Sequence, residues 1–179
     1  MARQIFTFTA PERFIVGTVG QPGERVFYLQ AKDGAHVVSV ALEKVQAQVL
    51  AERLDELLDE VRRRGSDIPV VADLEDVAPL DQPILEEFRV GTMSLAWDDD
   101  ADMVVIEALA QAEDGADVPE DDAAEGPDML RVRIAAGYAR AFVKRAVRVV
   151  QAGRPPCPLC GLPLDPEGHI CPRQNGHRT

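Results

Sequence analysis

Residues 25–41 read RVFYLQAKDGAHVVSVA, and this stretch decides how the first half of the chain folds. Aromatic and β-branched residues dominate both arms and alternate from one face to the other, which is typical of β-strands. Between the arms, Asp33-Gly34 is a dipeptide that accepts the positive φ angles of a tight hairpin turn. We therefore predict two antiparallel strands, Arg25–Ala31 and His36–Ala41, joined by this turn.

Two further strands are predicted before this hairpin, at Gln4–Phe8 and Phe14–Val19, because both segments are rich in aromatic and β-branched residues. Pro11-Glu12 separates them, and the turn-forming residues Gln21-Pro22-Gly23-Glu24 lead into the hairpin. These features predict that the chain opens with a four-strand antiparallel meander.

A long helix is predicted next, from about Leu42 to Arg64. Leucine and valine recur along it every three or four residues and form one apolar stripe, while acidic residues occupy the other side. The arginines at 62–64 followed by Gly65 are typical of a helix C-terminus. Cations are favoured at the negative end of the helix dipole, and glycine accepts the left-handed conformation that ends a helix.

A loop rich in proline and acidic residues, Ser66–Pro83, divides the chain into halves. After it the pattern predicts three strands and a second helix, at Glu87–Trp97, Met103–Ala110, Met129–Ile134 and about Ala135–Ala152. On a helical wheel the second helix has an apolar half that includes Tyr138. We expect its basic half to face solvent; this half comprises Arg140, Lys144, Arg145 and Arg148.

All three cysteines of the chain lie in its last 23 residues. Cys157 and Cys160 form a C-x-x-C turn, and Cys171 follows with one histidine on each side of it, His169 and His177. Thiolate and imidazole ligands at this spacing favour a tetrahedral Zn²⁺ site. His169 and Cys171 are two residues apart and would share one face of a strand. We therefore prefer His169 as the fourth ligand and keep His177 as the alternative; four protein ligands would make the ion structural.

These elements predict an α+β protein with antiparallel strands in a ββββα-βββα order, two long helices and a small C-terminal zinc knuckle. The α+β domain would span residues 1–153, with halves at about 1–65 and 84–153. The knuckle would span residues 154–179.

The formal net charge is −12, and all but two of the acidic residues precede Met129. An acidic excess argues against nucleic acid as a partner, because phosphate contacts need a basic surface. No apolar run reaches the roughly 18 residues of a membrane span, and the N-terminus lacks the apolar segment of a signal peptide. We expect a cytoplasmic protein with no membrane contact, in which the cysteines stay reduced.

Catalytic motifs are missing from the sequence. It contains no G-x-x-x-x-G-K-[ST], G-x-G-x-x-G or G-x-S-x-G pattern, and the only histidine outside the tail is His36. The sequence therefore names no catalytic residue and favours a protein that is not an enzyme.

Several segments carry a resemblance to a known family. They are GTVGQPG at 17–23, FYLQA at 27–31, FRVGTM at 88–93, EGPD at 125–128, GRPPCPLC at 153–160, DPEGHIC at 165–171 and NG at 175–176. Together they resemble a family of uncharacterised actinobacterial proteins, a domain of unknown function with a C-terminal CPxCG…GHxC zinc knuckle. The tail of this chain matches the family's pattern, GHxCxRxNGY, except at His177, where the family has tyrosine. The resemblance implies that His169 is the fourth ligand. It also implies a protein partner, because members of the family are encoded near phosphatase-like and kinase-like proteins.

Our leading hypothesis is a non-catalytic, zinc-containing binding or adaptor protein with a protein partner. Its expected docking face is basic and comprises Arg140, Lys144, Arg148, Arg154 and Arg173. One alternative is an enzyme that acts on an anionic or phosphorylated metabolite in a deep polar pocket between the two halves. Another is a single-strand nucleic-acid binder, because the order of elements resembles that of the Whirly and Pur-alpha proteins. The sequence leaves the oligomeric state open.

Overall fold

The structure is a computed structural model that describes residues 2–21, 23–65, 75–112, 122, 125–152, 157–162, 164 and 171–173. Its elements follow the predicted ββββα-βββα order. They are β1 (Ile5–Thr9), β2 (Arg13–Val19), β3 (Val26–Asp33), β4 (His36–Leu42), α1 (Lys44–Arg63), β5 (Glu86–Asp98), β6 (Met103–Ala110), β7 (Met129–Ala135) and α2 (Ala136–Gln151).

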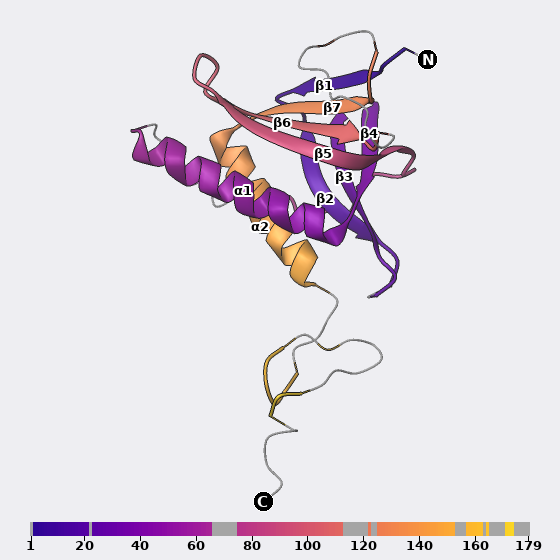
Figure 1. The fold of residues 1–179 in the computed structure, drawn as a ribbon, viewed down its shortest axis with the longest axis vertical. Helices are drawn as coiled ribbons and strands as arrows, with labels where there is room; N and C mark the ends of the chain where they lie inside the picture. Colours follow the sequence, from indigo (N-terminus) through magenta and orange to yellow (C-terminus); the bar gives the residue numbers. More distant parts are fainter. Residues whose placement is uncertain are drawn as a thin grey trace, which may run out of the picture.

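The strands form one seven-stranded sheet in the order β1-β7-β6-β5-β4-β3-β2 (Figure 1). The α+β class is therefore confirmed. The sheet is mixed rather than wholly antiparallel, because β4 pairs with β5 and β1 pairs with β7 in parallel. The β4–β5 pairing places the two halves of the chain side by side in the same sheet.

The predicted hairpin is confirmed, whereas the predicted four-strand meander is wrong at its first strand. Asp33 pairs with His36 across the turn, where Gly34 has a φ of +59°. However, β1 lies at the opposite edge of the sheet, beside β7. The reason is visible just after β1, where Ala10 adopts a φ of +48° and donates its N–H to the carbonyl of Arg133 at 2.8 Å. After Ala10 the chain turns away from its pairing with β7 and enters β2, which lies at the opposite edge of the sheet.

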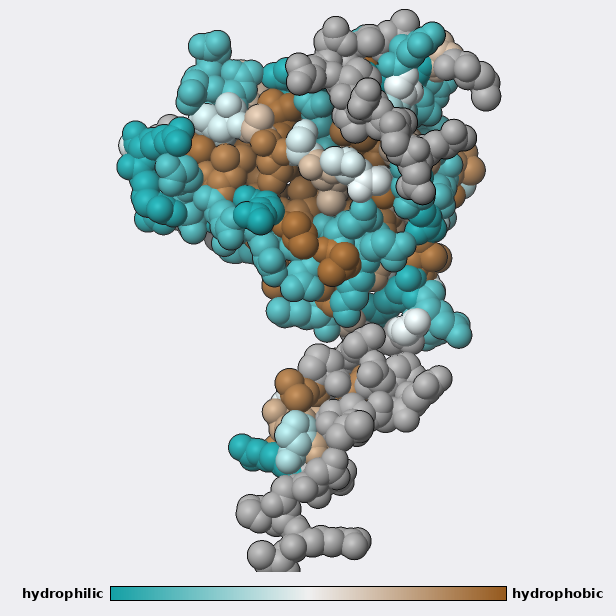
Figure 2. Space-filling model, in the orientation of Figure 1, coloured by the Kyte–Doolittle hydropathy of each residue, from teal (hydrophilic) through white to brown (hydrophobic). Residues whose placement is uncertain are grey.

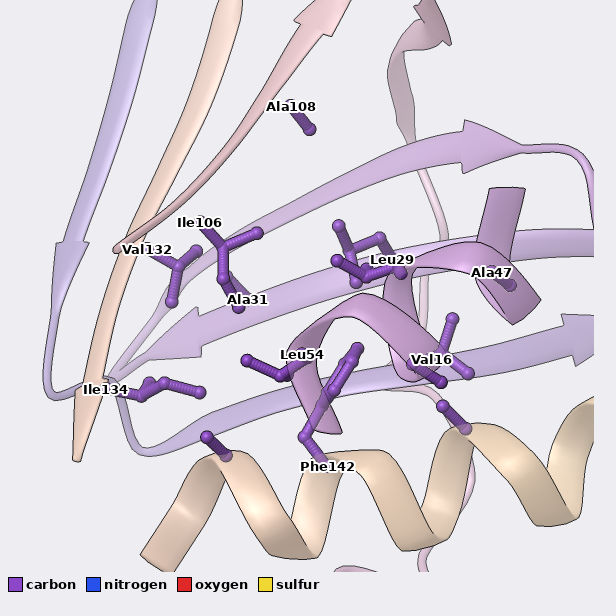
Figure 3. Packing of buried hydrophobic residues seen from close by; sticks show 14 of the residues in the cluster. Val16, Leu29, Ala31, Ala47, Leu54, Ile106, Ala108, Val132, Ile134 and Phe142 are labelled. Carbon is purple, nitrogen blue, oxygen red and sulfur yellow. The ribbon is translucent and has the colours of Figure 1, made fainter. Parts of the chain in front are cut away.

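Side chains from both helices and from the sheet meet in one apolar core (Figure 3). Leu54 of α1 is fully buried, and Phe142 of α2 points between the helices and the sheet. The buried residues of α1 recur at helical spacing, which confirms the predicted stripe; they are Ala47, Leu50, Ala51, Leu54, Leu58 and Val61. At the start of α1, Glu43 donates its backbone N–H to Gln46 Oε1 at 2.8 Å.

The predicted faces of α2 need two corrections. Arg145 was expected to face solvent, but only 5% of it is exposed. Tyr138 was assigned to the apolar half, but 54% of it is exposed. A helical wheel assumes a single packing surface, whereas α2 packs on the sheet and also against the segment at 76–78, whose carbonyls bind Arg145.

Candidate functional site

Three cysteine sulfurs converge in the C-terminal part of the chain, as the sequence predicts. Cys157 and Cys171 are buried, and Cys160 is half-buried. All three Sγ atoms lie within 4.8 Å of one another, and those of Cys157 and Cys171 are 3.9 Å apart. In Figure 1 the described tail segments that carry these cysteines, at 157–162 and 171–173, lie beyond the C-terminal end of α2.

Local backbone hydrogen bonds shape the C-x-x-C turn. Gly161 donates its N–H to the Cys157 carbonyl at 2.8 Å, and the Cys157 N–H donates to the Leu162 carbonyl at 2.7 Å. Gly161 has a φ of +74°, a left-handed conformation that favours glycine. The turn brings the thiols of Cys157 and Cys160 to one side, and Cys171 arrives from the end of the chain.

The geometry of the sulfurs fits a tetrahedral thiolate metal ion. A Zn–S bond of about 2.3 Å and a tetrahedral angle place two sulfurs about 3.8 Å apart. The Cys157–Cys171 separation of 3.9 Å is close to this value. A disulfide would need about 2.05 Å. The three cysteines could therefore hold a metal ion such as zinc.

The pKa values of the two thiols in the turn are shifted in opposite directions. Hydrogen bonds from the backbone N–H groups of Cys160 and Leu159 hold the pKa of Cys157 below its ordinary value. The Leu162 backbone N–H lowers the pKa of Cys160, but burial and the neighbouring sulfurs outweigh it and raise that pKa overall. The backbone N–H groups at Cys157 thus favour its thiolate, the form that binds a metal.

The fourth ligand and part of the expected docking face lie outside the described residues. This holds for His169, His177 and Arg154. The choice of His169, and the boundary of a knuckle at 154–179, therefore stay predictions.

The remaining residues of the expected docking face differ in their surroundings. Arg140 binds Asp55 and, at 2.6 Å, Asp59, both on α1. Arg148 lies 3.2 Å from Glu75, whereas Lys144 is exposed and forms no ion pair with the residues that the structure describes. Arg173 is exposed in the C-terminal part. These acids neutralise much of the charge on α2, and the docking role stays a prediction.

A half-buried ionic network on the segment at 75–81 is a feature that the sequence reasoning missed. Arg13 of β2 donates to Asp76 at 2.6 and 2.9 Å and to Asp81 at 2.5 Å. Lys32 of β3 adds a contact of 3.2 Å to Asp81. Contact with Arg13 holds the pKa of Asp76 below its ordinary value and, against the effect of burial, that of Asp81 as well.

Arg145 completes this network from α2. Its Nε donates to the Val16 carbonyl at 2.8 Å, and its Nη1 donates to the carbonyls of Asp76 and Ala78 at 2.6 Å each. No local sequence signal identifies this role, because the acceptors come from β2 and from a loop far away in the chain.

A cavity of about 200 Å³ lies beside this network, between the two halves of the chain. The stacked rings of Phe14 and Phe142, with centroids 4.7 Å apart, form an apolar wall. Arg13, Asp76 and Arg145 also line it, but they bind mainly to one another and to the backbone. It is smaller than the 300–1,000 Å³ typical of ligand pockets. It is therefore not the deep polar pocket that the enzyme alternative predicts.

An apolar groove of about 330 Å³ runs between α1 and β5, where Figure 2 shows exposed apolar surface. Val45 and Val49 of α1 are 65% and 45% exposed, and Met93 and Leu95 of β5 line the other wall. The predicted apolar stripe of α1 did not include these two valines, because it comprised Leu50, Leu54, Leu57, Leu58 and Val61.

The fold and the cysteine cluster define an α+β protein with three cysteines able to hold a metal ion. The chain matches the family model described as "Protein of unknown function (DUF3090)" over residues 6–171, and it belongs to this family. No curated protein and no solved structure matches it. The match confirms the resemblance to a family of unknown function but does not bear on the taxon of its members. No helix in the described part is both long and apolar enough to cross a membrane.

Proposed function

We propose that this protein is a non-catalytic binding or adaptor protein of the cytoplasm whose C-terminal residues fold around a structural Zn²⁺ ion. The observation that carries the proposal is the convergence of the Cys157, Cys160 and Cys171 sulfurs within 4.8 Å. His169 is the proposed fourth ligand, and His177 is the alternative.

Two physical arguments support a structural ion. About 23 residues cannot bury enough apolar surface to fold unaided, and segments of this size depend on a metal or a disulfide. Four protein ligands leave no open position at which an ion could activate water. The metal would supply folding free energy to the tail and no chemistry of its own.

The proposed docking surface for an acidic protein partner is the basic face of α2 together with the nearby tail. It comprises Arg140, Lys144, Arg148, Arg154 and Arg173. Ion pairs between partly exposed side chains contribute only about 0–1 kcal/mol. Arg140 and Arg148 could therefore exchange their present carboxylate partners for those of another protein at little cost.

Metal analysis of the purified chain tests the zinc site. We expect one zinc per chain, retained after dialysis against a weak chelator. A Cys157→Ser/Cys160→Ser variant and a His169→Ala variant should lose it, whereas a His177→Ala control should keep it. A wild-type chain that binds no zinc under reducing conditions would overturn the site. Loss in the His177→Ala variant alone would assign the fourth ligand to His177.

Capture of partners from native lysate tests the docking surface. We expect an Arg140→Glu/Lys144→Glu/Arg148→Glu variant to lose the bound protein. The matched control reverses three exposed charges on α1, in an Arg53→Glu/Arg62→Glu/Arg63→Glu variant, and should retain it. Circular dichroism establishes that both variants are folded. Equal capture by the two variants would contradict the proposed surface.

A protein that acts on an anionic metabolite is the second candidate. The observation in its favour is the arginine-rich junction between the two halves, at Arg13 and Arg145. Turnover of a phosphorylated or carboxylated metabolite by the metal-free Cys157→Ser/Cys160→Ser variant would support this candidate over the adaptor.

A further inference from the structure

A second, more open cavity of about 310 Å³ lies at the junction of β2, the segment at 77–80 and α2. Among its lining residues are Thr18, Arg145 and Arg148, and no carboxylate side chain of the described residues lines it. Arg145 and Arg148 are three residues apart on one face of α2, and both line this cavity. We propose that this cavity, defined by Thr18, Arg145 and Arg148, binds the phosphate group of a small phosphomonoester.

Arg145 supplies the first argument, because it is a buried cation with unused donors. Only 6% of its side chain is exposed. Its Nε and Nη1 bind the carbonyls of Val16, Asp76 and Ala78, whereas its Nη2 makes no hydrogen bond to any residue that the structure describes. A guanidinium has five N–H donors, and the two on Nη2 are not among the buried unpaired atoms of the described residues, so they stay accessible to a ligand in the cavity. An acceptor oxygen in the cavity would satisfy them.

The local charge supplies the second argument. Among the residues that the structure describes, four cations meet three carboxylates around the segment at 75–81, an excess of one positive charge in a protein of net charge −12. Glu75 contacts Nε of Arg148 at 3.2 Å and leaves its Nη groups without an ion pair in the described part. Burial lowers the pKa of Arg145, and the charges of Arg13 and Arg148 lower it further despite Asp76. A bound anion would relieve this excess of positive charge.

The arrangement of donors favours a tetrahedral oxyanion. Two arginines and the Thr18 hydroxyl, which makes no hydrogen bond within the described residues, offer three separate donor groups around one cavity. A phosphate presents an oxygen to each, whereas a planar carboxylate has only two oxygens. Val77, Leu80 and Val149 line the remainder and would contact the uncharged part of the ligand.

Titration of the full-length protein with inorganic phosphate, followed by amide chemical shifts, tests the proposal. Ionic strength is held constant with sodium chloride. We expect saturable shifts at Thr18 and Arg148 with a dissociation constant in the range of about 1 mM. Sulfate should compete, and acetate should bind more weakly. Shifts that do not saturate, or that chloride or acetate reproduces equally, would overturn the proposal.

Two variants locate the binding without removing Arg145, whose loss would leave one buried and two partly buried carbonyls without their donor. Arg148→Gln should weaken phosphate binding about fivefold, and Thr18→Val should weaken it about twofold. Lys144→Gln is the matched control, since Lys144 is exposed on the same helix and does not line the cavity. Unchanged binding in both Arg148→Gln and Thr18→Val would refute the site.

This inference does not depend on the zinc site, and the anion site shares only Arg148 with the docking surface. Phosphate binding should persist in the Cys157→Ser/Cys160→Ser variant, which lacks the metal ligands. If that variant binds phosphate normally and the wild-type chain captures no partner, the adaptor proposal fails while the anion site stands.

Discussion

Arg13 and Arg145 hold the segment at 75–81 through charge-assisted hydrogen bonds. Arg13 donates hydrogen bonds to the carboxylates of Asp76 and Asp81, while Arg145 donates to the backbone carbonyls of Asp76 and Ala78. Asp76 contacts both arginines, since its Oδ1 lies 2.9 Å from Nη2 of Arg13 and 3.5 Å from Nη1 of Arg145. This single carboxylate therefore connects β2 to α2.

The charge of Asp76 predicts an acid-dependent loss of stability. Arg13 holds the pKa of Asp76 below its ordinary value of about 3.9. A lowered pKa in the folded state stabilises the protein above about pH 4, and this stabilisation is lost as the pH falls through the folded value. We expect Asp76→Asn to cost about 1–2 kcal/mol at pH 7 and progressively less below pH 4. Urea unfolding at several pH values, followed by Trp97 fluorescence, measures the difference.

An Asp99→Asn variant is the control for this experiment. Asp99 is exposed at the tip between β5 and β6 and forms no ion pair within the described residues. It should unfold like the wild type at every pH. A cost for Asp76→Asn that is the same at pH 3 and at pH 7 would contradict the argument.

Gly17 of β2 packs directly under Leu80 of the segment at 75–81. A Cβ atom at Gly17 would lie 2.6 Å from Cγ of Leu80, closer than real contacts allow. Leu80 is itself only 7% exposed. The missing side chain at Gly17 therefore lets the segment at 75–81 lie close to the sheet, where the arginines bind it.

A double-mutant cycle measures this contact between β2 and Leu80. Gly17→Ala should destabilise the wild type by about 1–3 kcal/mol because of overpacking. In a Leu80→Ala background the same change should cost much less, because the obstructing atoms are gone. Gly91→Ala is the comparison: its Cβ would meet the backbone Cα of Gln111 at 2.9 Å, so Leu80→Ala should give no relief. Equal costs of Gly17→Ala in both backgrounds would disprove the contact.

At the scale of the whole molecule, the sheet and the helices form a core of their own. Among the described residues, the core cluster runs from Phe8 to Val150 and includes none of the three cysteines. The metal site would therefore stabilise the tail without stabilising the domain.

Metal removal tests this independence. We expect a strong chelator to release zinc and to change the midpoint of thermal unfolding, followed by Trp97 fluorescence, by less than about 2 °C. Proteolysis between residues 154 and 179 should accelerate at the same time, because the tail loses the metal ion that folds it. Re-addition of zinc is the control and should restore protection. A decrease in the midpoint of about 5 °C or more would show that the metal also supports the domain.

The sequence by itself determined the order of the elements, the hairpin at Asp33-Gly34, the apolar stripe of α1 and the clustering of cysteines. These features depend on residue spacing within one element or turn, which local steric and periodic rules control. The sequence also predicted which thiols meet, because a C-x-x-C turn positions two sulfurs locally.

Only the tertiary structure decided the position of β1 beside β7, the parallel β4–β5 pairing and the burial of Arg145. Arg145 and its acceptor Val16 are 129 residues apart in the chain, and β1 pairs with a strand more than 120 residues away. Such pairings depend on which edges and carbonyls remain available once the whole core has formed. A helical wheel therefore places the arginines of the proposed anion site on the solvent-facing half of α2, and only the packing of α2 against β2 shows that Arg145 is buried.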